Sequence, residues 1–328
     1  MVTQIHKNPN IFKVDVCLPE SPLKNLNCYV IPTPEDTLII DTGFNRPECL
    51  QALREGLDEL GVDLKRSTLF LTHLHSDHIG LSADLAEAGA RVMMSRVDYE
   101  YIHLRDLDGG WSWMEDLFER EGLPRELVDL QRKVNPARAF APRKPIRAQT
   151  LEDGELLTVG DLSFRGILTP GHTPGHMCLY LEEEQILFCG DHILFNISPN
   201  ITMWRYVEDS LGSYLDSLEK VRGLDIKLAL PAHRQNDMDV YQRIDQLKKH
   251  HDARLSQTLS ILEANPGLNA CQIGAQLTWS MRGKNWEEFP IQQKWFALGE
   301  TIAHLDYLVV RGSVLRRETE SGIHYYLP

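Results

Sequence analysis

Three features are scarce in this sequence: long apolar runs, cysteine and positive charge. No stretch approaches the roughly 18 consecutive apolar residues that a membrane span requires, so we expect no integral membrane protein. The six cysteines include no Cys-x-x-Cys pair, which argues against a disulfide scaffold and favours reduced thiols. The opening residues, MVTQIHKNPNIFKVDV, lack the apolar core of a secretory signal, and the expected compartment is therefore the cytoplasm.

The shortage of positive charge bears on possible partners. The 328 residues contain 34 Lys and Arg against 47 Asp and Glu, for a net charge of −13. Proteins that bind nucleic acid usually carry a basic footprint, so this balance disfavours them. Hydrophobic residues make up 42% and charged residues 25%, which is typical of globular proteins and excludes a disordered chain. At about 150 residues per domain, the length indicates about two domains.

Short apolar runs alternate with amphipathic stretches over the first 240 residues. Helices are predicted at 47–60, 78–88 and 211–221. The runs typical of strands lie at 27–31, 37–40, 67–72, 90–95, 156–159, 162–168, 177–181, 186–189 and 227–230. This alternation predicts a layered α/β domain over residues 1–241. Residues 96–150 interrupt it, and we interpret them as a helical insertion that is either ordinary packing or a cap over the site.

From residue 242 the pattern changes to helices. Three helices are predicted at 252–264, 270–277 and 291–309, and two β-runs follow at 313–318 and 323–327. Three helices and a terminal hairpin are typical of a winged-helix-like module, so we expect a second domain at 242–328. Its third helix contains Lys294 but also Glu300 and Asp306, and is not basic. We therefore favour a structural module that covers the mouth of the active site, or a homodimer face, over a module that binds nucleic acid.

The clearest chemical signal is the segment Thr-His-Leu-His-Ser-Asp-His-Ile-Gly at 72–80. His73 and His75 are two positions apart, so on extended backbone they point the same way. Asp77 and His78 follow at the turn into a helix. This spacing suits two metal ions, because alternate residues can reach different sides of one cleft. Neutral imidazole and carboxylate are ligands that zinc accepts.

Three further candidates follow later predicted strands. His172 lies in Thr-Pro-Gly-His, Asp191 in Phe-Cys-Gly-Asp and His233 in Leu-Pro-Ala-His. Each lies close to glycine or proline just after a strand, where a side chain is presented into a cleft. We therefore expect the seven imidazole and carboxylate groups to converge around metal ions.

The order of His-Leu-His-Ser-Asp-His, Thr-Pro-Gly-His, Cys-Gly-Asp and Pro-Ala-His resembles the metallo-β-lactamase superfamily. The opening Asn-Cys-Tyr-Val-Ile and Leu-Ile-Ile-Asp-Thr-Gly, with Asp41, is similar to that family's first strands. The resemblance implies an αββα sandwich of two mixed sheets with helices outside. It assigns a first divalent metal to His73, His75 and His172, a second to Asp77, His78 and His233, and the bridge between them to Asp191. Zinc is the default metal, and the same ligands accept manganese or iron.

Departures from the family pattern narrow the choice among the branches of the superfamily. The bridging residue is Asp191 and not cysteine, which argues against an antibiotic-hydrolysing enzyme and favours the glyoxalase II-like branch. His75 stands where the flavodiiron branch has glutamate, which argues against that branch. Asp191 and His233 are only 42 positions apart, so the extra domain of the RNA-cleaving polyadenylation-factor-like branch has no room.

The chemistry that this resemblance implies is hydrolysis of a small ester or thioester. Two dications roughly 3.5–4 Å apart lower the pKa of a bridging water, and the hydroxide attacks the carbonyl. Asp77 is the candidate catalytic residue, because it can orient that hydroxide. The alternatives are a phosphodiesterase or endoribonuclease with the same metal pair, a persulfide dioxygenase with a single iron, and a non-enzymatic winged-helix regulator. The complete second ligand set argues against the single iron.

Other side chains are candidates for supporting roles. Asp41 and His176 are expected to hold ligands in place by hydrogen bonds. Candidate contacts to a small-molecule substrate are Trp204 and Tyr206, which follow Asp191, then Arg234 beside the last ligand, and Arg282 in the loop before the last helix. The arginines suit an anionic tail on the substrate.

Overall fold

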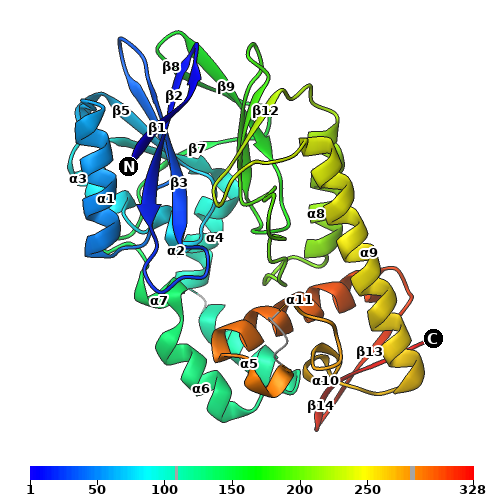
Figure 1. The fold of residues 1–328 in the computed structure, drawn as a ribbon. Helices are drawn as coiled ribbons and strands as arrows, with labels where there is room; N and C mark the ends of the chain where they lie inside the picture. The colour runs from blue at the N-terminus through cyan, green and yellow to red at the C-terminus, as the bar shows by residue number, and fades with distance from the viewer. Residues whose placement is uncertain (108–109, 281–284) are drawn as a thin grey trace. The chain divides into compact units, whose positions relative to one another are not determined.

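The computed structural model describes residues 1–107, 110–280 and 285–328 (Figure 1). The chain divides into two compact units of three segments each. Unit 1 contains residues 1–102, 136–199 and 217–243, and unit 2 contains residues 103–135, 200–216 and 244–328. The sequence predicted one boundary, after residue 241, whereas unit 2 also takes in two earlier segments.

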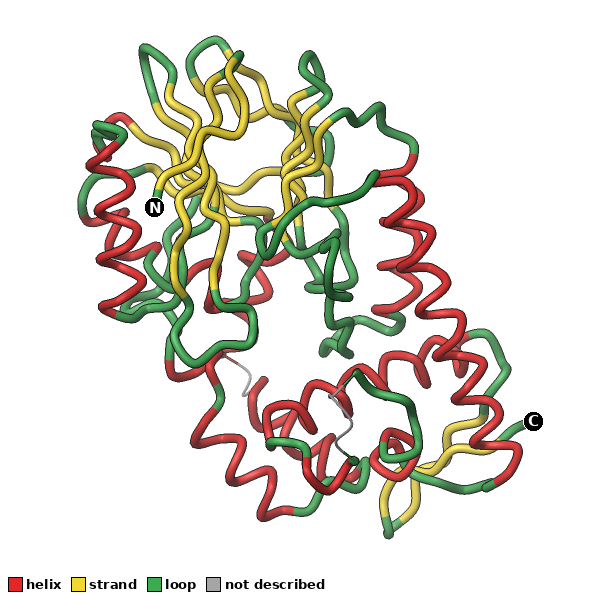
Figure 2. Tube along the Cα trace, in the orientation of Figure 1, coloured by secondary structure: helices red, strands yellow, loops and turns green. Residues whose placement is uncertain are grey.

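A seven-stranded sheet forms the first layer of unit 1, with its strands side by side in chain order. Figure 2 shows the strands of this unit in yellow. Pairing is antiparallel from β1 to β4 and parallel from β4 to β7. The strands are β1 (Val2–Lys7), β2 (Asn10–Cys17), β3 (Asn25–Pro32), β4 (Thr37–Ile40), β5 (Ser67–Leu71), β6 (Arg91–Ser95) and β7 (Gln149–Leu151). The expected helical insertion at about 96–150 did not include a strand at its end, where β7 pairs with β6.

A five-stranded sheet in the order β12-β11-β10-β9-β8 forms the second layer. Its strands are β8 (Leu156–Val159), β9 (Leu162–Leu168), β10 (Met177–Leu181), β11 (Ile186–Gly190) and β12 (Leu228–Pro231), and only β11 and β12 pair in parallel. One buried cluster joins Phe70 and Met93 of the first sheet to Phe164 and Phe188 of the second. The apolar faces of the two sheets therefore meet, and each such side chain contributes about 1.5–3 kcal/mol by leaving water.

Helices cover the outside of the first sheet (Figure 1). Helix α1 (Pro47–Glu59) packs tightly on β2, because a Cβ at Gly56 would come within 2.4 Å of Val14 Cγ1. Helix α3 (Ser82–Glu87) contacts β6. The predicted α/β sandwich is confirmed. Unit 1 also contains η1 (Leu64–Arg66), α7 (Pro136–Ala139) and the second half of α8 (Ser210–Arg222).

The single helix predicted over 78–88 is wrong. The structure has α2 (Ser76–Ile79), then a break at Gly80 and Leu81, then α3. The chain at Gly80 runs against other backbone, since a Cβ there would come 2.4 Å from Asn45 N and 2.5 Å from Gly43 O. The close approach leaves no room for a side chain at the exit of α2.

Unit 2 is mainly helical and ends in a two-stranded hairpin. Its helices are the end of α4 (Arg96–Leu107), α5 (Gly110–Arg120), α6 (Arg125–Val134), the start of α8, most of α9 (Val240–Ala264), α10 (Ala270–Gly274), η2 (Trp286–Glu288) and α11 (Ile291–Val310), followed by β13 (Leu315–Thr319) and β14 (Gly322–Tyr326). The predicted start of the first C-terminal helix at residue 252 is wrong, because α9 begins at Val240. Helix α11 packs on α6 and α10. Among the described residues, no helix is long and apolar enough to cross a membrane.

Candidate metal centre

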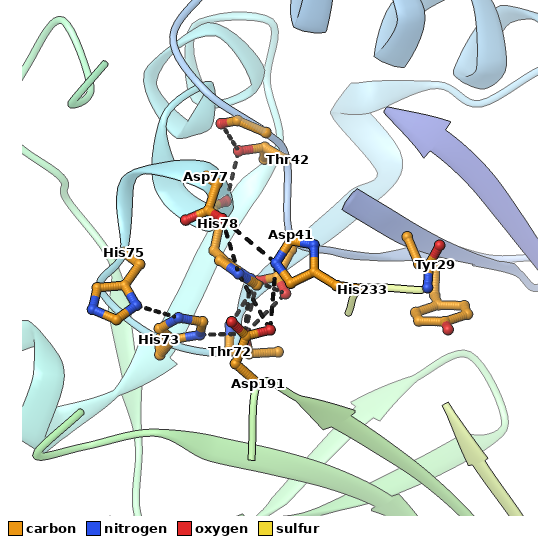
Figure 3. A network of polar contacts seen from close by, with 12 residues as sticks. Tyr29, Asp41, Thr42, Thr72, His73, His75, Asp77, His78, Asp191 and His233 are labelled. Carbon is orange, nitrogen blue, oxygen red and sulfur yellow. Dashed lines mark hydrogen bonds and ion pairs between the residues drawn. The ribbon is translucent and has the colours of Figure 1, made fainter. Parts of the chain in front are cut away.

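The structure brings the seven candidate ligands together, five from segments that follow strands and two from a helix. Figure 3 shows six of them: His73, His75, Asp77, His78, Asp191 and His233. His73 and His75 follow β5, and Asp77 and His78 lie on α2. The other three follow strands of the second sheet: His172 after β9, Asp191 after β11 and His233 after β12.

The ligand atoms fall into three overlapping groups, in each of which they lie within 4.8 Å of one another. The groups are His73, His75 and His172; His73, His78 and Asp191; and Asp77, His78 and His233. Asp191 lies between the first and last groups. Its Oδ2 is 3.6 Å from His172 Nε2, while its Oδ1 is 3.7 Å from His78 Nε2 and 3.4 Å from His233 Nε2. The family resemblance implies a bridging carboxylate at this residue.

Unsatisfied buried atoms test whether these residues suit a metal ion. His78 Nε2, His233 Nε2 and Asp191 Oδ1 are buried and have no hydrogen-bond partner among the residues that the structure describes. Burying such atoms without hydrogen bonds is costly, so they indicate a site that binds a ligand. Imidazole nitrogen and carboxylate oxygen are ligands for zinc and similar divalent ions. The donor set therefore fits a divalent cation.

The carboxylates favour positive charge at the centre. Burial alone would lower the pKa of His78, but Asp41, Asp191 and Asp77 raise it well above its usual value. Around His73 the balance is reversed, because burial and the neighbouring histidines hold its pKa well below the usual value. His73 is therefore a neutral imidazole, which is the form that binds metal.

Asp41 orients the histidines by hydrogen bonds, as the sequence suggested. His78 Nδ1 donates to Asp41 Oδ2 at 2.8 Å, which leaves Nε2 facing the centre. Thr72 donates from its backbone N to Asp41 Oδ1 at 2.9 Å and from Oγ1 to Oδ2 at 2.8 Å. Thr72 Oγ1 also lies 3.0 Å from His73 Nδ1. Asp41 adopts a left-handed φ of 62°, which is uncommon outside glycine and often found at functional sites.

The remaining ligands are held partly through backbone atoms. The N–H of Asp191 donates to His176 Nε2 at 3.1 Å. His233 Nδ1 donates to the carbonyl oxygen of Asn25 at 2.9 Å, so its Nε2 also faces the centre. A Cβ at Gly190 would come 2.5 Å from His176 Nε2, so only glycine allows this approach just before Asp191. The role of the Asn25 carbonyl leaves no signal in the sequence, because every residue carries that atom.

Comparison with known proteins agrees with this geometry. Residues 23–233 match the family model described as "Metallo-beta-lactamase superfamily". The chain belongs to the metallo-β-lactamase superfamily. Residues 287–328 match a second model, described as "Metallo-beta-lactamase-like, C-terminal domain". The resemblance drawn from the sequence motifs is thereby confirmed, and hydrolase is the general class that it supports.

Several members of the superfamily are similar over much of the chain. The "Lactamase-like protein adaB" of Aspergillus niger is 25% identical over 316 residues, which is 86% of this chain and 83% of that protein. The "Atrochrysone carboxyl ACP thioesterase nsrC" of Aspergillus novofumigatus is 28% identical over 222 residues, covering 68% of this chain but only 53% of its own. The crystal structure of the metallo-beta-lactamase family protein TTHA1429 from Thermus thermophilus has a TM-score of 0.82 and 31% identity, covering 97% of this chain and 98% of that one.

The candidate substrate contacts are placed in different parts of the chain. Arg234 follows the last ligand with a left-handed φ of 65°, and its Nη2 donates to the carbonyl oxygen of Pro22. Trp204 is buried, whereas Tyr206 is 69% exposed, and both belong to unit 2. Arg282 lies outside the described residues. Contact of these four residues with substrate stays a prediction.

Proposed function

We propose that this superfamily member is a dinuclear metal-dependent hydrolase that cleaves a small thioester or ester, as glyoxalase II-like enzymes do. The observation that carries this proposal is the place of Asp191, whose two carboxylate oxygens approach His172 on one side and His78 and His233 on the other. A carboxylate so placed suits a pair of cations better than a single one. The name of the related thioesterase from Aspergillus novofumigatus supports a thioester substrate.

Two divalent ions at such a centre, zinc by default, would act as Lewis acids and lower the pKa of a bound water toward neutrality. His73, His75 and His172 would hold the first ion, and Asp77, His78 and His233 the second, with Asp191 shared. Asp77 has a second task in this scheme. Burial acts to raise the pKa of Asp77, but His78 and His233 outweigh this effect and lower the pKa from its usual 3.8 to about 2. Asp77 is therefore a carboxylate at neutral pH and can accept a hydrogen bond from the attacking water.

The complete group of Asp77, His78 and His233 favours hydrolysis over a dioxygenase reaction at a single iron. Three further expectations stay predictions. They are a cytoplasmic location, a winged-helix-like C-terminal module, and a homodimer face on that module.

A substrate panel tests the proposal. The zinc-loaded protein is offered S-lactoylglutathione, short acyl-coenzyme A esters, an acyl carrier protein thioester and a lactone, and release of thiol or acid is followed. We expect turnover of at least one thioester, and its loss in the Asp77→Ala variant. Cleavage of bis(p-nitrophenyl) phosphate with no thioester turnover would instead indicate a phosphodiesterase. Oxygen consumption with glutathione persulfide would indicate the dioxygenase.

A further inference from the structure

Asp98 is a fully buried carboxylate outside the seven candidate ligands. It is the third residue of α4 and accepts three hydrogen bonds. Its Oδ2 accepts from Leu74 N at 2.9 Å and from Thr173 Oγ1 at 2.8 Å, and its Oδ1 accepts from Gly175 N at 2.7 Å. All three donors are neutral.

These three donors belong to the two segments that carry the first group of histidines. Leu74 lies between His73 and His75, and Thr173 directly follows His172. The carboxylate thus connects the turn after β5 to the turn after β9. A hydrogen bond to an ionised acceptor contributes about 1.5–3 kcal/mol, so Asp98 in its ionised form is able to hold the two turns at a fixed separation.

The start of α4 is arranged around this contact. Ser95 Oγ accepts from Asp98 N at 3.2 Å and donates to Gly175 O at 2.5 Å. The Ser-x-x-Asp spacing resembles a capping box, in which the acidic side chain turns back to the first residue of the motif. In this protein the carboxylate faces the two histidine turns. A Cβ at Gly175 would come 2.3 Å from Asp98 N, so glycine is required for the close approach.

Burial raises the pKa of Asp98 to about 7, although the bonds from Thr173, Gly175 and Leu74 act in the opposite direction. A buried acid with neutral partners is expensive for the fold, and such groups concentrate at functional sites.

We propose that Asp98 is a positioning residue, which sets the distance between the His73–His75 turn and the His172 turn and so tunes the affinity of the first metal position. This role depends on the metal centre of the proposed function and is independent of the identity of the substrate. Outer hydrogen-bond partners of metal ligands typically change metal affinity by about 10–100-fold when they are replaced.

The Asp98→Asn variant tests this role at nearly constant volume. An amide presents one oxygen and one NH2, so either Leu74 N or Gly175 N loses its acceptor. We measure zinc affinity by competition with a chromogenic chelator, the absorption spectrum of the cobalt-substituted protein and the melting temperature of the metal-free protein. The matched control is Asp84→Asn, because Asp84 is also a buried acid in unit 1, but it pairs with Arg143.

We expect Asp98→Asn to weaken zinc binding by about 10-fold or more and to change the cobalt spectrum, while the control changes neither. The Thr173→Val variant removes one donor of the three and should shift both readouts less, in the same direction. If both variants keep wild-type zinc affinity and cobalt spectrum and lose only stability, Asp98 is a structural residue and the proposal is overturned. A protein that fails to cleave thioesters but shows the affinity change would disprove the substrate class alone.

Discussion

The two carboxylates of the metal centre differ in their surroundings. Asp191 approaches three histidines, namely His172, His78 and His233. Asp77 lies 3.9 Å from His78 and 3.5 Å from His233, which belong to its own group. Asp77 is therefore the residue whose removal affects one metal position and leaves the other intact.

We expect Asp77→Ala or His78→Ala to reduce the metal content from about two ions per chain toward one, because each removes a ligand of the second position. Turnover should fall by several orders of magnitude. Elemental analysis and steady-state kinetics measure the two effects. His6→Ala on β1, far along the chain from every ligand, should alter neither, and unchanged turnover in Asp77→Ala would remove the mechanism.

Gly80 shapes the backbone behind the ligands of α2. A Cβ at this position would approach three backbone atoms, the closest being Asn45 N at 2.4 Å. Backbone cannot give way as a flexible side chain can, so we expect Gly80→Ala to lower the free energy of unfolding by about 3 kcal/mol. Gly223→Ala is the matched control, because its closest contact is Lys220 O at 3.4 Å. Urea denaturation that ranks the two variants equally would contradict this reason for the glycine.

At the scale of elements, Glu121, the residue directly after α5, connects the helices of unit 2 to the terminal hairpin. Glu121 is fully buried and its Oε1 accepts from Tyr325 Oη of β14 at 2.7 Å. Burial raises the pKa of Glu121 to about 7 from its usual 4.5, although Tyr325 and Arg316 counteract the increase.

This raised pKa makes the stability of the fold depend on pH. The folded protein holds the proton more tightly than the unfolded chain, so the stabilisation is complete below about pH 4.5 and is lost as the pH rises through about 7. The full span corresponds to about 3 kcal/mol. We expect Glu121→Gln to flatten the fall in unfolding free energy between pH 5 and 7.5, measured by urea denaturation. The exposed Glu126→Gln should keep the wild-type slope, and an equally steep slope in Glu121→Gln would contradict the assignment.

How well each element could be predicted depended on what stabilises it. The amphipathic α1 and the apolar strands β9, β10 and β11 were predicted close to their observed bounds, because their pattern is local. The three-residue β7 was missed, since its pairing with β6 lends it a structure that its own residues do not specify. The break between α2 and α3 was missed for a related reason, because the contacts of Gly80 and Leu81 with residues 42–45 exist only in the fold.

The same distinction applies to the metal centre. Histidine and aspartate beside glycine or proline at strand ends are visible in the sequence, and the seven predicted side chains converge. Asp98 was missed, because Ser-Arg-Val-Asp predicts only the start of a helix and its contacts with Leu74 and Gly175 exist only in the fold. Backbone acceptors such as Asn25 O leave no pattern at all.

At the scale of the whole molecule, metal removal should lower stability. Within the described parts of the chain, His78 Nε2, His233 Nε2 and Asp191 Oδ1 are buried without hydrogen-bond partners, so a bound cation would satisfy them. Binding to the folded state alone stabilises by about 4 kcal/mol when free zinc exceeds its Kd a thousandfold. We expect chelation to lower the melting temperature by several degrees and added zinc to restore it, as measured by calorimetry. Identical melting curves with and without the chelator would contradict a metal centre in the folded protein.

The most direct test of the central claim is the number of divalent ions that the purified wild-type chain binds. The metal-free protein is dialysed to equilibrium against zinc, and protein-bound zinc is counted by elemental analysis. Seven converging side chains arranged around a shared Asp191 predict close to two ions per chain. A protein that retains no ion under these conditions would contradict the account.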